Sequence, residues 1–271
     1  MNTGISAHTT VTELVDIWLK QLRAQGRLEN TTINEYERVL RKLVVPGLGD
    51  FHLHELTTER IDTLLAELAT QSVNRQRKAK VVIGAMLDVA ALCGAVATNP
   101  VRGSMSVRRP KPETRELTLA ELESVRKAVN AWMGKERPGP KASSDMADVI
   151  DLMVATGLRI GEVLALRWSD VDLDAGRLAI SGTVKTESGK GTYRKTLANT
   201  RTVVLAEFAV GLLERRRHLV PDNANDAVLP TRNGTWHQVN NVERRWRQIR
   251  SEAGLEWLTP HDFRHNARRE A

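Results

Sequence analysis

The sequence has few of the residues on which several common protein classes depend. Its 271 residues include a single cysteine, Cys93, which excludes a disulfide framework and a zinc site built from cysteines. No run of about 18 apolar residues occurs, and the first ten residues contain neither the basic nor the apolar region of a signal peptide. We therefore expect a cytoplasmic protein that makes no contact with membranes.

Tyrosine is also scarce, with only Tyr36 and Tyr193, whereas positive charge is in excess. Forty Lys and Arg residues against 33 Asp and Glu residues give a formal net charge of +7. This excess is compatible with a nucleic-acid partner, because Lys and Arg contact phosphates. Many ordinary proteins carry a similar charge, so the excess alone does not identify the partner.

Residues 10–93 have the apolar periodicity and end signals of four helices joined by short connections. Thr10 and Glu13 form a capping box at the first helix, and Pro46 and Gly47 are predicted to close the second. The predicted helices run from Thr10 to Gly26, from Asn30 to Val44, from Thr57 to Leu68 and from Ser72 to Cys93. Four short-looped helices predict a compact helical domain, to which we assign residues 8–107.

A basic, proline-containing segment, residues 108–116, is the predicted linker, and residues 117–271 form the second domain. Residues 177–181 and 201–205 have the composition of strands on either side of a polar stretch. The helices expected around them cover residues 118–133, 144–156, 207–218 and 239–253. The predicted fold class is therefore mainly α with a small antiparallel β-sheet (α+β).

Two segments of the second domain place a charged pair at helical spacing. Arg159 and Glu162 are three residues apart at a predicted helix start, so the carboxylate can orient the guanidinium. The alternative is a surface ion pair that contributes little to stability. His261 and Arg264 have the same spacing after Pro260, which suits the first turn of a helix. A titratable imidazole beside a permanent cation suits phosphoryl chemistry, although both could also be solvated side chains.

Together these segments resemble the tyrosine site-specific recombinase family, which includes the phage integrases. Residues 156–171 are similar to the family's first arginine box, and residues 259–265 to the His-x-x-Arg-His element of its second. The likeness covers about residues 8–271. It implies a SAM-like core-binding domain, a basic linker and a recombinase catalytic domain that act on duplex attachment-site DNA without a cofactor or metal.

The resemblance also implies roles for individual residues. Arg159 and Arg264 would clamp the scissile phosphate, His261 would transfer a proton or donate a hydrogen bond, and Glu162 and His265 would support them. Of the lysines between the boxes, Lys185, Lys190 and Lys195, the last best fits the family's general acid. The family breaks and rejoins strands through a 3′-phosphotyrosyl bond. We expect this protein to associate with itself on DNA, in a bacterial or phage-infected cell.

The sequence departs from the family at the nucleophile. It stops at Ala271, seven residues after Arg264, where the family continues to a tyrosine, so we expect a C-terminally truncated integrase. Tyr36 lies on the apolar face of a predicted helix and Tyr193 lies on the hairpin. Neither position suits the nucleophile. The second hypothesis is therefore a catalytically inactive DNA-binding remnant or regulator.

Basic residues outside the boxes are candidate DNA contacts, with solvated helix faces as the alternative. They are Arg75, Arg77, Lys78, Lys80, Arg108, Arg109, Arg244, Arg245 and Arg247.

Two other motifs are weaker. The segment from His261 to His265 approximates the His-Glu-x-x-His zinc motif, with Asp262 in place of Glu and no obvious third ligand. Residues 188–192 resemble a phosphate-binding loop, but a hairpin turn explains them better.

Overall fold

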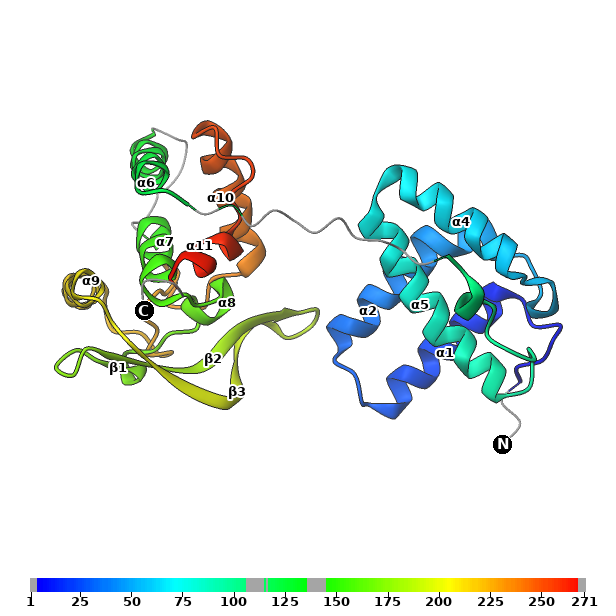
Figure 1. The fold of residues 1–271 in the computed structure, drawn as a ribbon. Helices are drawn as coiled ribbons and strands as arrows, with labels where there is room; N and C mark the ends of the chain where they lie inside the picture. The colour runs from blue at the N-terminus through cyan, green and yellow to red at the C-terminus, as the bar shows by residue number, and fades with distance from the viewer. Residues whose placement is uncertain (1–3, 106–114, 116, 136–144, 268–271) are drawn as a thin grey trace. The chain divides into compact units, whose positions relative to one another are not determined.

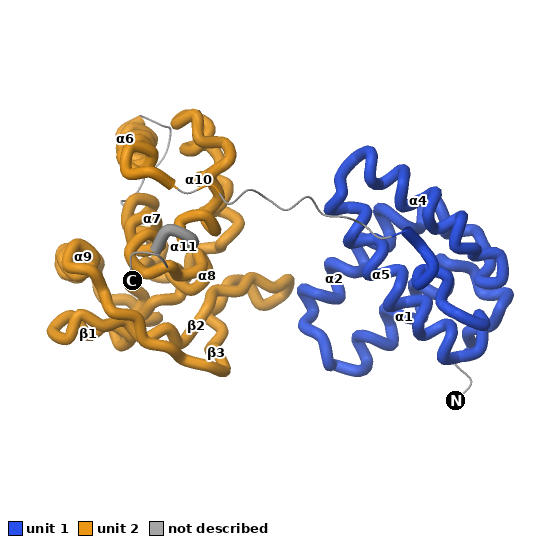
Figure 2. The backbone as a smooth tube through the Cα atoms, in the orientation of Figure 1, with its two compact units in different colours: residues 1–112 blue, residues 113–271 orange. Residues whose placement is uncertain are grey.

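The computed structural model describes residues 4–105, 115, 117–135 and 145–267 (Figure 1). The chain divides into two compact units, residues 1–112 and 113–271 (Figure 2). The predicted linker, 108–116, spans this division, and all of its residues except Arg115 lie outside the described ones. Within the described part of the chain, no helix is long and apolar enough to cross a membrane.

The first unit is helical, as predicted. Its core is one cluster of buried apolar side chains, to which every long helix contributes. Thr10 caps the first helix in the predicted box with Glu13, and Gly26 ends it in the left-handed conformation. The four main helices are α1 (Val11–Gln25), α2 (Asn30–Val39), α4 (Thr58–Gln71) and α5 (Val73–Leu92), with short 3-10 turns η2 (Leu53–Glu55) and η3 (Pro100–Gly103).

The end predicted for the second helix is wrong, because the helical path continues through Pro46. A π-helical segment, η1 (Leu40–Val44), follows α2 and leads into α3 (Val45–Leu48). Pro46 lies in the first turn of α3, where its missing N–H leaves no hydrogen bond broken. The wider π turn therefore restarts the helix just before the proline.

The second unit packs helices against a three-stranded antiparallel sheet. The sheet order is β1-β2-β3, and the strands are β1 (Val171–Asp172), β2 (Arg177–Glu187) and β3 (Gly191–Val204). The helical elements are α6 (Leu119–Gly134), α7 (Asp145–Thr156), α8 (Ile160–Val163), η4 (Trp168–Asp170), α9 (Glu207–Leu219), α10 (Val239–Glu252) and α11 (Pro260–Ala267). This confirms the predicted class, a mainly helical fold with a small sheet.

The hairpin is longer than the sequence predicts, since the polar stretch between the expected strands is itself paired. Gly182 pairs with Thr196 and Glu187 with Gly191, so pairing extends to the turn. Most of β3 is exposed, which explains why its polar composition concealed a strand. The register shifts between Ile180 and Gly182, at a bulge that separates the buried base of the hairpin from its outer part.

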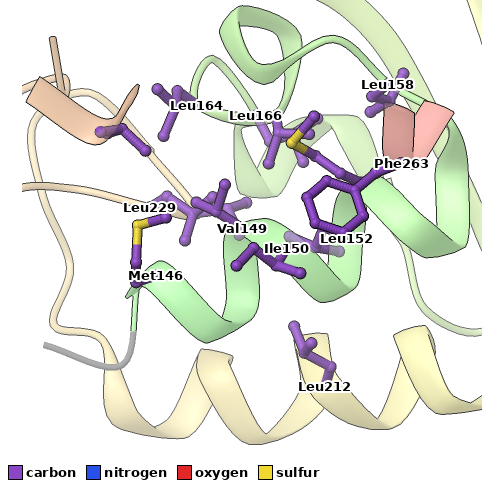
Figure 3. Close-up of a cluster of buried hydrophobic side chains, with 14 of the residues drawn as sticks. Met146, Val149, Ile150, Leu152, Leu158, Leu164, Leu166, Leu212, Leu229 and Phe263 are labelled. Carbon is purple, nitrogen blue, oxygen red and sulfur yellow. The ribbon is translucent and has the colours of Figure 1, made fainter. Parts of the chain in front are cut away.

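The core of the second unit forms around α7, whose apolar side chains are buried on several faces (Figure 3). Leu212 from α9 and Phe263 from α11 belong to the same cluster, together with Leu158 and Leu164 from either side of α8. Phe263 is only 1% exposed. Burial of this ring fixes the orientation of α11 and of the polar residues beside it.

Candidate active site

The two arginine segments lie together, although about a hundred residues separate them in the sequence. A pocket of about 290 Å³ is lined by Arg159, His261 and Arg264, with Leu158, Ile160, Glu243, Thr259 and Pro260 completing its wall. Two permanent cations and an imidazole therefore face one cavity. This combination suits an anionic oxygen ligand such as a phosphate.

Buried neighbours place each of these side chains. Gly157 ends α7 in the left-handed conformation, and Leu158 is fully buried, so the next residue, Arg159, emerges at the start of α8. At α11, the backbone N–H and the hydroxyl of Thr259 both donate to Asp262, each at 2.7 Å. This cap and the buried Phe263 set the helix so that His261 and Arg264 border the pocket.

Glu162 is the anchor of the pocket's first arginine, as the spacing predicted. Its side chain is 4% exposed, and it accepts hydrogen bonds from the backbone N–H of Arg159 at 3.0 Å and from the Arg159 Nη1 at 3.2 Å. Burial raises the pKa of this carboxyl. The hydrogen bonds from Arg201 and the Arg159 backbone, together with the positive charges of the two arginines, lower the pKa by more than burial raises it. The pKa therefore lies below its usual value, and Glu162 is an anion at neutral pH.

Arg201 is a second partner of Glu162 that the sequence reasoning missed. Its Nη2 lies 2.7 Å from Oε2 of Glu162 and its Nη1 lies 3.3 Å from Oε1. The residue opens the strand predicted over residues 201–205, so its charge is visible in the sequence. The signal was present, but sequence separation of 39 residues concealed the contact.

The hairpin is fixed by Arg194, whose side chain is 7% exposed. It passes over Gly182 and donates to the carbonyl of Ala165 at 2.9 Å and to Asp170 at 3.1 Å. A Cβ at Gly182 would lie 2.3 Å from the guanidinium carbon, so this crossing requires glycine. The neighbouring side chain, Lys195, is exposed.

Lys195 does not line the pocket in this structure. Its strand position is nevertheless tied to the pocket's wall, because it pairs with Thr183, whose hydroxyl packs against Gly161 in α8. Lys185 pairs with Tyr193 further out along the hairpin, and Lys190 lies in the turn and forms an ion pair with Glu187.

Neither tyrosine faces the pocket. The Tyr193 hydroxyl donates to Glu187 at 2.6 Å, and the Tyr36 ring stacks on Trp18 in the first unit. Residues 188–190 form the turn of the hairpin, as predicted for the segment that resembles a phosphate-binding loop. His265 belongs to α11, but its side chain lies outside the described residues, as do Arg108 and Arg109. The described residues contain no cluster of His, Cys, Asp and Glu placed to hold a metal.

The basic residues predicted on two helices differ in their partners. On α5, Lys78 forms an ion pair with Glu35, Arg75 donates to Gln71, and Lys80 donates to the carbonyls of Ser104 and Met105. Arg77 makes no ion pair or hydrogen bond with a described residue, and with Lys80 it borders a groove of about 650 Å³.

On α10, one face is buried through Val242, Trp246 and Ile249. Arg244 and Arg247 are exposed and Arg245 is half-buried. Within the described part of the chain, none of these three arginines pairs with a carboxylate. The opposite face of the helix is therefore positively charged.

Comparison with known proteins agrees with this geometry. A family model described as "Phage integrase family" matches residues 115–270, which is more than half of the chain. The chain belongs to the phage integrase family. A second model, "Phage integrase, N-terminal SAM-like domain", matches residues 10–69, within the helical first unit. The family expected from the two arginine boxes is thereby confirmed.

Relatives of this phage integrase family member include curated and solved proteins. Tyrosine recombinase XerC of Alcanivorax borkumensis is 26% identical over 268 residues, which cover 96% of this chain and 80% of that protein. The Tn1549 transposon integrase in complex with circular intermediate DNA has a TM-score of 0.78 at 18% identity, covering 96% of this chain and 85% of that one. A lambda integrase dimer bound to a COC' core site has a TM-score of 0.74 at 18% identity, covering 96% of this chain and 69% of that one. At these identities the solved structures show a shared fold.

Proposed function

We propose that this protein is a site-specific DNA recombinase that breaks and rejoins duplex strands through a 3′-phosphotyrosyl intermediate. The observation that carries the proposal is the pocket in which Arg159, His261 and Arg264 meet. The solved relatives are integrases in complex with DNA, including a dimer on a core site. We accordingly assign duplex DNA as the substrate, self-association on that DNA, and the cytoplasm of a bacterial or phage-infected cell as the location.

In the proposed reaction, Arg159 and Arg264 bind the non-bridging oxygens of the scissile phosphate. Their charges stabilise the additional negative charge of the five-coordinate transition state. A tyrosine hydroxyl passes its proton to His261 as its oxygen attacks phosphorus. The bond from phosphorus to the 5′-oxygen breaks, and Lys195 donates a proton to the leaving oxygen. His261 donates a hydrogen bond to the phosphate, and Glu162 orients Arg159.

We assign the nucleophile to neither Tyr36 nor Tyr193. The Tyr36 ring is stacked on Trp18, and the Tyr193 hydroxyl is bound to Glu187. A nucleophile must instead lie in line with the bond that breaks, next to the arginines that hold the phosphate.

For binding of the duplex outside the pocket, the proposal relies on exposed arginines. Arg77 on α5 and Arg244 and Arg247 on α10 carry charges that no described carboxylate neutralises. Lys78 is a weaker candidate because Glu35 already pairs with it. Arg108 and Arg109 of the linker stay predicted contacts. Binding should weaken steeply with salt, because each neutralised phosphate releases counterions.

The family match disfavours the second hypothesis, an inactive DNA-binding remnant. The match extends over residues 115–270, and the pocket retains both arginines, the histidine and the buried carboxylate. A remnant needs only the basic surfaces, because DNA binding alone does not require an oriented arginine pair at a cavity.

Trapping of the covalent intermediate tests the proposal. The protein, expressed from its complete reading frame, is incubated with a duplex selected for binding from a random-sequence pool and nicked near the site of cleavage. We expect a protein–DNA adduct that resists denaturation, whose peptide map shows a tyrosine linked to a 3′-phosphate. Tight binding without any adduct would favour the remnant, and an adduct at Tyr193 would overturn our assignment of the nucleophile.

A further inference from the structure

Two arginines share one buried carboxylate at the edge of the pocket. Glu162 is 4% exposed and receives Arg159 from its own helix start and Arg201 from β3. Three unit charges, two positive and one negative, leave the cluster with a net positive charge. One guanidinium can therefore neutralise the carboxylate while the other remains available to an anionic ligand.

The two arginines bind the carboxylate unequally. Arg201 contacts both carboxylate oxygens, at 2.7 and 3.3 Å, in the two-pronged arrangement that suits a guanidinium. The guanidinium of Arg159 offers one nitrogen, at 3.2 Å, and the Arg159 side chain is 63% exposed against 42% for Arg201. Arg201 is thus the main neutralising partner, and most of the Arg159 guanidinium is left outside this interaction.

The backbone of Arg201 is held rigidly enough for this task. It pairs with Ile180, which is 1% exposed in the core, on the buried side of the hairpin's bulge. The following strand end is tied back through the N–H of Leu205, which donates to the carbonyl of Gly176 at 2.8 Å. Motion of the hairpin's outer part therefore has little effect on the position of Arg201.

We propose that Arg201 is a positioning residue that occupies Glu162 so that Arg159 stays in the pocket to bind the scissile phosphate. Without Arg201, the buried carboxylate would lack its closer partner, and an unneutralised buried anion is costly. Glu162 would then draw the Arg159 guanidinium into a two-pronged pair of its own and away from the phosphate. The inference rests on the proposed recombinase function.

A double-mutant cycle tests this mechanism. The single-turnover cleavage rate and the Kd for the nicked duplex are measured for the wild type, Arg201→Gln, Glu162→Gln and the double variant. We expect Arg201→Gln alone to slow cleavage about 10- to 100-fold, by analogy with the loss seen when a partner that orients a metal ligand is removed, with little change in Kd. In the Glu162→Gln background, whose neutral amide cannot form a two-pronged ion pair with Arg159, the same substitution should change the rate by less than about threefold.

Two further variants separate positioning from general effects. Arg201→Lys keeps a positive charge beside Glu162 but loses the two-pronged geometry of the guanidinium. It should therefore retain part of the cleavage rate that Arg201→Gln loses. Arg177→Gln removes an exposed arginine from β2 of the same sheet and should leave rate and Kd unchanged. Thermal unfolding of every variant shows whether a lost rate reflects a lost fold.

The outcomes distinguish this inference from the function on which it rests. If the wild type forms no covalent adduct, the recombinase proposal is wrong. If the wild type cleaves and Arg201→Gln slows cleavage equally in both backgrounds, or weakens the Kd in proportion, Arg201 binds DNA directly and the positioning role is overturned. A fully active Arg201→Gln variant would also overturn it.

Discussion

Two clusters in the second unit join arginines to buried carboxylates, and only one of them borders a pocket. In the pocket cluster, Glu162 holds Arg159 and Arg201, whose side chains are 63% and 42% exposed. In the buried cluster, Asp145 and Asp148 of α7 hold Arg216 of α9, whose side chain is 3% exposed, while the exposed Arg215 reaches Asp148 only at 3.5 Å. The carboxylates are alike in burial, so the arginines make the difference.

That difference decides what each cluster can do. All three guanidinium nitrogens of Arg216 are engaged, by Asp145, by Asp148 and by the carbonyl of Val228. His237 also lies 3.2 Å from Asp145, which closes the cluster further. A guanidinium that is 3% exposed, with every nitrogen engaged inside the protein, can join helices, but a ligand cannot reach its remaining donors. The exposed guanidinium of Arg159 retains donors for one.

The first prediction concerns the buried cluster and has the largest expected effect. Replacement of Arg216 by Met keeps much of the apolar volume but leaves Asp145 and Asp148 without their shared cation. Removal of one partner of a buried ion pair costs about 3–5 kcal/mol of folding free energy. Urea unfolding followed by circular dichroism measures this loss. A variant as stable as the wild type would mean that the cluster does not hold α9 against α7.

The second prediction concerns the pocket cluster. Arg159→Ala should slow DNA cleavage about 10²- to 10³-fold, as expected when one transition-state donor is removed, and should leave the unfolding free energy nearly unchanged because the side chain is exposed. Adduct formation on the nicked duplex and urea unfolding give the two measurements. Arg126→Ala, which removes an exposed partner of Asp151, is the matched control and should affect neither strongly. Equal losses of activity and stability in Arg159→Ala would erase the contrast with Arg216.

The sequence predicted the helices and the main pocket residues because their signals are local. The capping box at Thr10 marks a helix start that the structure confirms, and the helix predicted from residue 118 begins at a capping box of Thr118 and Glu121. The three-residue spacings of Arg159 with Glu162 and of His261 with Arg264 each put two residues on one helix turn. The resemblance to a known family then joined two segments that spacing alone could not bring together.

The missed features depend on contacts between residues far apart in the chain. Arg201 reaches Glu162 across 39 residues, and Arg216 reaches Asp148 across 68. The exposed hairpin lacks the apolar alternation of a half-buried strand, so its length was underestimated. No local rule distinguishes an arginine that will be buried from one that will face solvent, although that is the property that separates the two clusters.

The third prediction tests an intermediate arrangement, in which a buried arginine holds the strand that carries Lys195. Gly182→Ala would place a methyl group 2.3 Å from the guanidinium carbon of Arg194, so the arginine must move from the Ala165 carbonyl and Asp170. Overpacking of this kind costs about 1–3 kcal/mol. Gly211→Ala on α9 is the control, because its added methyl meets no atom within 4 Å and alanine favours helix by up to about 1 kcal/mol. Equal stability of the two variants in urea would show that Arg194 does not need the space above Gly182.

The last prediction extends the comparison to a carboxylate whose partners are all exposed. Hydrogen bonds from Arg38 and then from Lys78 lower the pKa of Glu35 to about 2, but its side chain is 38% exposed and that of Lys78 is 43% exposed. Lys78→Gln should therefore cost only about 0.2–1 kcal/mol at neutral pH.

The dependence of this small effect on conditions identifies its origin. Because the folded pKa of Glu35 is below the unfolded value, the stabilisation is complete above pH 4.5 and is lost as the pH falls toward 2. It should also shrink at about 1 M salt, where the screening length is about 3 Å. Urea unfolding of Lys78→Gln and wild type across these conditions measures both trends. A difference of several kcal/mol, or one insensitive to salt, would mean that exposure of the cation is not what separates weak from strong clusters in this protein.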